Sequence, residues 1–127
     1  MAKDFGMKKN IVLVLIFALM CMNIFAQRQS PEVRALQGTW ELIAGMNDEE
    51  SFTEEDVRAE NLEVLYIFSG DSISIRRNNE TIGPVRFEVV PGYIRLLGET
   101  TYYLPYNLQG RILILHEGGY AFIYRRR

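Results

Sequence analysis

The feature that most constrains this chain is a succession of short alternating segments separated by turns. Ser72-Ile73-Ser74-Ile75-Arg76 is the clearest, and its period of two predicts a strand with one buried and one solvated face. Pro91-Gly92 and Gly118-Gly119 are typical turn sequences. The pattern predicts about eight strands: Thr39–Ala44, Glu63–Phe68, Ser72–Arg76, Thr81–Val90, Tyr93–Leu97, Thr100–Tyr106, Arg111–Leu115 and Tyr120–Arg125.

The topology follows from the lengths of the connections. No segment between the predicted strands is long enough for a parallel crossover helix, so consecutive strands must pair antiparallel in an up-and-down meander. A meander has two open edges unless it closes on itself, and closure into a barrel removes them. We therefore predict an all-β fold, a small eight-stranded barrel whose interior is filled or holds one small ligand.

The N-terminus has the layout of a secretory signal peptide. A basic start at Met7-Lys8-Lys9-Asn10 precedes the apolar stretch Ile11–Met20, and Ile24-Phe25-Ala26 places a small residue before Gln27. We expect cleavage after Ala26, which divides the chain into a signal peptide (1–26) and a barrel domain (27–127). The expected location is the periplasm or the extracellular space.

Two alternatives for this segment stay open. A retained membrane anchor would need about 20 apolar residues, and the run here ends at Asn23. Attachment of a lipid to Cys21 would need a small residue before it, where Met20 stands. Both are less favoured than cleavage, so we expect no membrane span after processing.

Charge and cysteine content exclude several classes of protein. Losing Lys3, Lys8, Lys9 and Asp4 with the signal peptide reduces the 14 basic and 16 acidic residues to 11 and 15, a net charge of −4. Such a domain lacks the positive field that nucleic-acid binding needs. The one cysteine, Cys21, lies in the signal peptide, so the mature chain has no disulfide and no thiolate nucleophile or metal ligand.

Two segments outside the strands have helical signals. Ser30 is an N-cap candidate for a helical turn over Pro31–Gln37. The acidic loop Asp48–Glu60 contains Thr53 followed by Asp56, a capping box that predicts a helical turn over Glu54–Ala59. We interpret this loop as a solvated cover over one end of the domain, with a lid as the alternative. Its spacing does not match a calcium-binding loop, and we predict no metal.

Leu36-Gln37-Gly38-Thr39-Trp40-Glu41-Leu42 resembles the Gly-x-Trp signature in the first strand of lipocalins and of smaller bacterial lipocalin-like domains. Tyr66–Ile73 and Gly119–Arg125 are similar to that group's second hairpin and last strand, so the resemblance covers roughly Leu36–Arg126. It implies that Trp40 plugs the closed end of the barrel, with an arginine of the last strand, here Arg125, stacked over it. The chain is much shorter than full lipocalins, which argues against a roomy cavity of their size.

The residues give little support to catalysis. His116 is the only histidine and sits beside Glu117 before Gly118-Gly119, so we interpret it as an exposed turn residue rather than a general base or ligand. There is no zinc-ligand spacing, no Gly-x-Ser-x-Gly elbow and no phosphate-binding loop. We expect no enzyme, no catalytic residue and no cofactor.

Two functions remain. The first is an exported, monomeric binding protein that holds a small apolar or amphipathic molecule in the barrel or at its mouth. The inward faces of the strands would supply the ligand-binding residues Tyr66, Phe68, Ile75, Phe87, Ile94, Tyr102 and Phe122. The alternative is an exported protein-interaction module, an inhibitor or envelope accessory protein, that acts through loops such as Asn47–Glu60 on a side-chain-filled barrel.

Overall fold

The computed structural model describes residues 29–127, almost all of which belong to one compact unit, Glu32–Arg127. The predicted signal peptide and its cleavage site lie outside the described residues. Within 29–127, no helix is long and apolar enough to cross a membrane.

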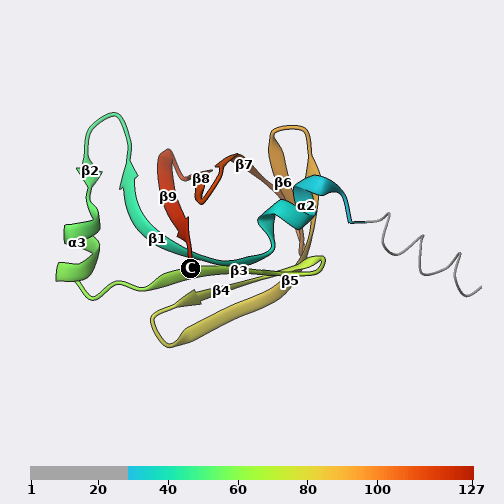
Figure 1. The fold of residues 1–127 in the computed structure, drawn as a ribbon, viewed down its shortest axis with the longest axis horizontal. Coiled ribbons are helices and arrows are strands. Elements are labelled where there is room, and N and C mark those ends of the chain that lie inside the picture. The colour runs from blue at the N-terminus through green and yellow to red at the C-terminus, as the bar shows by residue number, and fades with distance from the viewer. Residues whose placement is uncertain (1–28) are drawn as a thin grey trace, which may run out of the picture. The chain divides into compact units, whose positions relative to one another are not determined.

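Two short helices and nine strands make up the described part of the chain (Figure 1). In chain order they are α2 (Pro31–Leu36), β1 (Gly38–Met46), β2 (Ser51–Phe52), α3 (Glu54–Ala59), β3 (Val64–Ser69), β4 (Ser72–Arg77), β5 (Glu80–Val90), β6 (Tyr93–Leu97), β7 (Thr101–Gln109), β8 (Ile112–Glu117) and β9 (Tyr120–Arg126). All eight predicted strands are therefore present, most of them one or more residues longer than expected.

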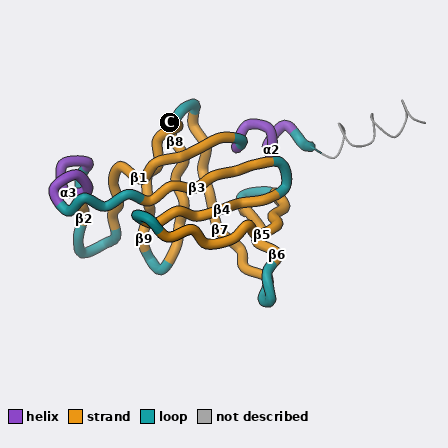
Figure 2. Tube along the Cα trace, turned by 90° about the horizontal axis from the view of Figure 1, so that it is seen from below, coloured by secondary structure: helices purple, strands orange, loops and turns teal. Residues whose placement is uncertain are grey.

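The sheet is an antiparallel meander that closes on itself. Strands β3 to β9 follow β1 in chain order, each pairing with the next, and β9 pairs back with β1. Eight strands thus form a closed barrel. Figure 1 and Figure 2 show the strands from two directions. The predicted fold is confirmed. The two-residue β2 is an addition to β1, paired only at Gly45 and Met46.

Most hairpins turn at a glycine, and the β4–β5 hairpin turns at Asn78, which has a φ of 54°. Gly118 and Gly119 have φ angles of 59° and 83° between β8 and β9, a backbone that joins right-twisted strands and disfavours other residues. His116 and Glu117, which we expected in this turn, instead complete β8. In β5 the pairing with β4 shifts between Ile73 and Ile75, opposite Gly83. This irregularity agrees with the bend expected there.

A tryptophan–arginine pair closes the end of the barrel at which β1 begins. Trp40 is completely buried, and its indole Nε1 donates to the carbonyl of Leu36 in α2 at 2.8 Å. The guanidinium carbon of Arg126 lies 4.3 Å from the centre of the Trp40 ring. Its two terminal nitrogens donate to the carbonyls of Gln37 (2.5 Å) and Ala35 (2.6 Å). One side chain therefore stacks on the plug and satisfies carbonyls at the end of α2.

This pairing corrects the prediction that Arg125 covers Trp40. Trp40 pairs with Arg126 across β1 and β9, whereas Arg125 is bonded to Glu54 of α3 at 2.8 Å. The reason is strand alternation: Phe122 faces inward, and the residue in phase with it is Arg126, not Arg125.

Gly38 and Gln37 are adapted to the same closed end. Gly38 has a φ of 118°, and a Cβ on it would lie 3.1 Å from an Arg126 nitrogen. The Gln37 side chain accepts from the Gly70 amide at 2.7 Å and donates to the Gly70 carbonyl at 2.9 Å. These two bonds tie the end of α2 to the turn between β3 and β4.

The acidic loop has regular structure. The Thr53 side chain accepts from the Asp56 amide and the Asp56 side chain accepts from the Thr53 amide, so the capping box and helix α3 are as predicted. Strand β2 was not predicted, because a strand of two residues has no period to detect. Figure 1 shows α2 and α3 at opposite ends of β1.

Candidate functional site

The interior of the barrel is filled over only part of its length. Buried side chains pack together in a core cluster of Leu36, Trp40, Leu42, Val64, Tyr66, Phe68, Ile73, Phe87, Ile94, Leu104, Leu113, Leu115 and Tyr124. Phe68 and Phe87 meet edge to face with their ring centres 5.4 Å apart. At the end of β1, β3 and β9 away from α2, the interior opens into a pocket.

This pocket, the mouth pocket, has a volume of about 480 Å³. That volume lies within the range of about 300–1,000 Å³ typical of small-molecule sites. Its lining consists of Leu42, Phe52, Leu62, Val64, Tyr66, Ile75, Arg77, Ile82, Glu117, Phe122 and Tyr124. Seven of these side chains are wholly apolar, and four carry a polar or charged group. The chemistry is therefore that of an amphipathic site.

A pair of packed tyrosines lies at the inner side of the pocket. The rings of Tyr66 and Tyr124 meet edge to face with centres 4.9 Å apart, and both side chains are buried. The hydroxyl of Tyr66 donates to a carboxylate oxygen of Glu117 at 3.3 Å. Tyr66 and Glu117 are 51 residues apart in the chain, so only the closed barrel brings them together.

Both phenols have a raised pKa. Burial raises the pKa of Tyr66 well above its ordinary value, and the nearby Glu117 carboxylate adds to the effect. Burial also raises the pKa of Tyr124, with further contributions from Tyr66 and Glu117. Neither hydroxyl is a general base or a nucleophile at neutral pH, so both serve as hydrogen-bonding groups.

Two opposite charges stand at the rim. Arg77 ends β4 and Glu117 ends β8, and both are exposed. They form no ion pair with each other, although both affect the pKa of Tyr66. The rim therefore offers a carboxylate held by Tyr66 and a solvated guanidinium to any molecule in the pocket.

The acidic loop supplies one wall. Phe52 of β2 lines the pocket and lies 6.3 Å from Phe122, ring centre to ring centre. A Cβ on Gly45 would overlap the Phe52 ring, so the glycine makes room for it. Two further contacts fix the loop to β9: Tyr120 donates to Glu50, and Arg125 donates to Glu54. The loop is thus a cover attached to the barrel mouth.

Six of the seven predicted ligand residues face the interior of the barrel, at two different depths. Tyr66, Ile75 and Phe122 line the mouth pocket. Phe68, Phe87 and Ile94 are buried in the filled core and have no access to it.

Tyr102 does not line the interior, so the prediction that it binds the ligand is corrected. Its side chain is 46% exposed. Tyr102 alternates in phase with the buried Leu104, but it lies next to the turn before β7, where the core no longer covers it. Alternation gives the face of a residue, not its depth along the barrel.

Sequence reasoning missed several pocket residues. Tyr124 alternates in phase with Phe122 and could have been found from that signal. Phe52 and Leu62 lie outside the long strands, and no periodicity identifies them. Arg77 and Glu117 look like ordinary turn-flanking charges in the sequence, and only the register places both at one mouth.

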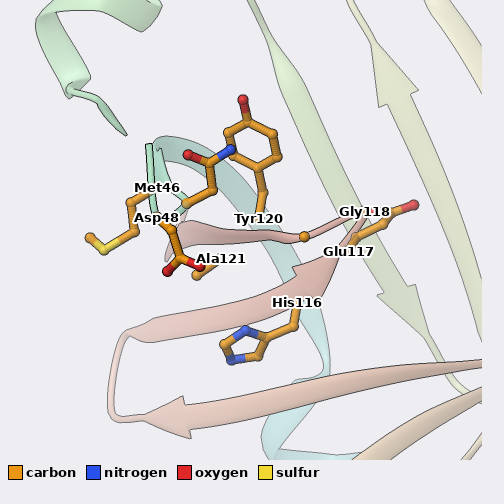
Figure 3. Close-up of a pocket in the computed structure, with 9 residues that line it drawn as sticks. Met46, Asp48, His116, Glu117, Gly118, Tyr120 and Ala121 are labelled. Atoms are coloured by element: carbon orange, nitrogen blue, oxygen red, sulfur yellow. The ribbon is translucent and has the colours of Figure 1, made fainter. Parts of the chain in front are cut away.

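His116 lies in a second, shallower hollow of about 410 Å³ beside the mouth, formed by the β1–β2 loop and the β8–β9 hairpin. In Figure 3 the imidazole of His116 and the carboxylate of Glu117 point away from each other, as alternation along β8 requires. His116 is exposed, and its imidazole makes no hydrogen bond to a described residue. Across residues 29–127, no three histidine, cysteine or acidic side chains are grouped as metal ligands would be.

Comparisons with protein-family models, with curated proteins and with solved structures found no match. The mouth pocket is therefore the feature from which a function can be inferred.

Proposed function

We propose that this protein is an exported binding protein of lipocalin-like type, which holds a small apolar or amphipathic molecule in the mouth pocket. The observation that carries the proposal is the pocket of about 480 Å³ with apolar walls, a pair of tyrosines at its inner side and a carboxylate at its rim. Filling all of the interior with side chains would stabilise a barrel more than leaving such a space open. A retained opening of this size is better explained by an occupant.

No enzymatic step is part of the proposal. The groups in the pocket are two protonated phenols, one carboxylate and one guanidinium. They suit recognition, in which apolar walls provide affinity and a few polar groups orient the ligand.

The alternative of protein interaction through Asn47–Glu60 stays a prediction. Three side chains of this loop, those of Glu50, Phe52 and Glu54, contact the barrel itself. The loop thereby contributes to the mouth pocket, which supports ligand binding as the first function to test.

The test is native mass spectrometry of the protein purified without denaturant from the host that exports it. We expect the chain to begin at Gln27 and to carry extra mass that solvent extraction removes. The variant Leu62→Trp places a large side chain into the pocket from its wall, whereas Tyr102→Trp enlarges an exposed residue outside it. Extra mass absent from Leu62→Trp and present in Tyr102→Trp supports the proposal. Extra mass retained equally by both variants contradicts it.

A further inference from the structure

The hydrogen bond between Tyr66 and Glu117 has a direction. Tyr66 uses its one hydroxyl proton to donate to a carboxylate oxygen of Glu117. The Tyr124 ring packs edge to face against that of Tyr66, with ring centres 4.9 Å apart, and all three side chains line the mouth pocket.

This direction leaves capacity to accept hydrogen bonds at Glu117. The Tyr66 proton is used, whereas a carboxylate can accept about four hydrogen bonds and Glu117 receives one from Tyr66. A molecule entering the pocket therefore meets a carboxylate that Tyr66 orients and that still has capacity to accept. A ligand with a donor group matches this end, and a carboxylate ligand would be repelled by it.

The surrounding charge acts in the same direction. Asp48 lines the hollow beside the mouth, and Glu117 lines both that hollow and the mouth pocket. The chain from Gln27 has a net charge of −4. Arg125, a nearby cation, is already bonded to Glu54. Arg77 is the opposing charge; it is exposed and forms no ion pair with a described residue, whereas Glu117 is oriented by the hydrogen bond from Tyr66.

We propose that the ligand is a small cationic amphiphile, a primary amine whose ammonium group binds Glu117 and whose alkyl part lies against Leu42, Val64 and Phe122. This inference rests on the proposed function and names the class of molecule that the same site takes. An ammonium group supplies three donors to the carboxylate, and its bond to an ionised acceptor is stronger than a neutral one.

The test uses octylamine, octanol and octanoate, three probes with the same alkyl chain, in calorimetric titrations of the exported protein. We expect octylamine to bind at least tenfold more tightly than octanoate, with octanol between them. Glu117→Gln should weaken octylamine about tenfold and leave octanol nearly unchanged. Tyr66→Phe, which removes the bond that orients Glu117, should weaken octylamine by a smaller factor.

Glu99→Gln is the matched control, since it removes the same charge from an exposed turn residue outside the pocket. Near-ultraviolet circular dichroism confirms that each variant keeps its barrel. Equal or tighter binding of octanoate that Leu62→Trp abolishes would overturn the amine inference and support the proposed function. Binding of none of the three probes, together with a bare native mass, would overturn both.

Discussion

Arg126 combines three contacts at one point of the barrel. It stacks on the Trp40 ring and donates to the carbonyls of Ala35 and Gln37. Two charge-assisted bonds and a partly buried cation–π contact together outweigh a single exposed ion pair. The neighbouring Arg125 makes only such a pair, with Glu54. Two adjacent residues of one type therefore have very different weight in the stability of the fold.

Replacing Arg126 by alanine should lower the free energy of unfolding by about 2–3 kcal/mol, because the stacking and both bonds are lost together. Arg125→Ala should cost less than about 1 kcal/mol. Urea denaturation followed by Trp40 fluorescence measures both. Equal losses from the two variants would argue against the assignment of Arg126 to the closed end.

The tyrosine pair predicts a dependence of stability on alkaline pH. The pKa of Tyr66 is raised above its ordinary value of 10.0 in the folded protein. The folded state therefore keeps a proton that the unfolded state loses, so the stabilisation is complete below pH 10 and decreases as pH rises beyond it. The urea midpoint should fall above pH 10, and the fall should be smaller in Tyr66→Phe. Tyr102→Phe, which changes an exposed tyrosine, should show the same fall in urea midpoint as the parent protein. The same fall in Tyr66→Phe would contradict the role given to the buried Tyr66.

At the scale of elements, the positions of the strands in the sequence were predictable, whereas the depth of each side chain along the barrel was not. Alternation and glycine turns identify β1 and β3 to β9, and the Thr53–Asp56 spacing identifies α3. Strand β2 exists only because Phe52 packs over Gly45 and Phe122, which is a tertiary contact. The register, including the shift between Leu42 and Ala44, decides which residues reach the mouth, and no local pattern records it.

The capping box of α3 should control the order of the loop without affecting the barrel. Thr53→Ala removes the acceptor for the Asp56 amide, a change that costs about 1 kcal/mol. Amides of 54–60 should then exchange about fivefold faster, while those of β8 keep their protection, because no hydrogen bond of the barrel is lost. Hydrogen exchange measured by NMR reports separately on the amides of 54–60 and on those of β8. Faster exchange throughout β8 would mean that the loop is coupled to the barrel as a whole.

At the scale of the whole molecule, the barrel has two differently built ends. Trp40, Arg126 and α2 close one end, and Phe52, Tyr66 and Glu117 surround the opening at the other. The sequence predicts a barrel that is either filled or hollow, and the distinction depends on packing between strands far apart in the chain. The barrel is neither completely filled nor completely hollow, because Tyr66 and Tyr124 fill the middle of the interior and present their hydroxyls to the mouth.

The central claim, that the mouth pocket is a binding site, is tested most directly by an NMR titration of the protein with octylamine. Saturable shifts should concentrate at Leu42, Val64, Tyr66 and Phe122, while the indole Nε1–H of Trp40, bonded to Leu36, stays unchanged. Shifts confined to the exposed Tyr93 and Tyr103, or no saturable shift at the pocket residues with any of the three octyl probes, would contradict the claim.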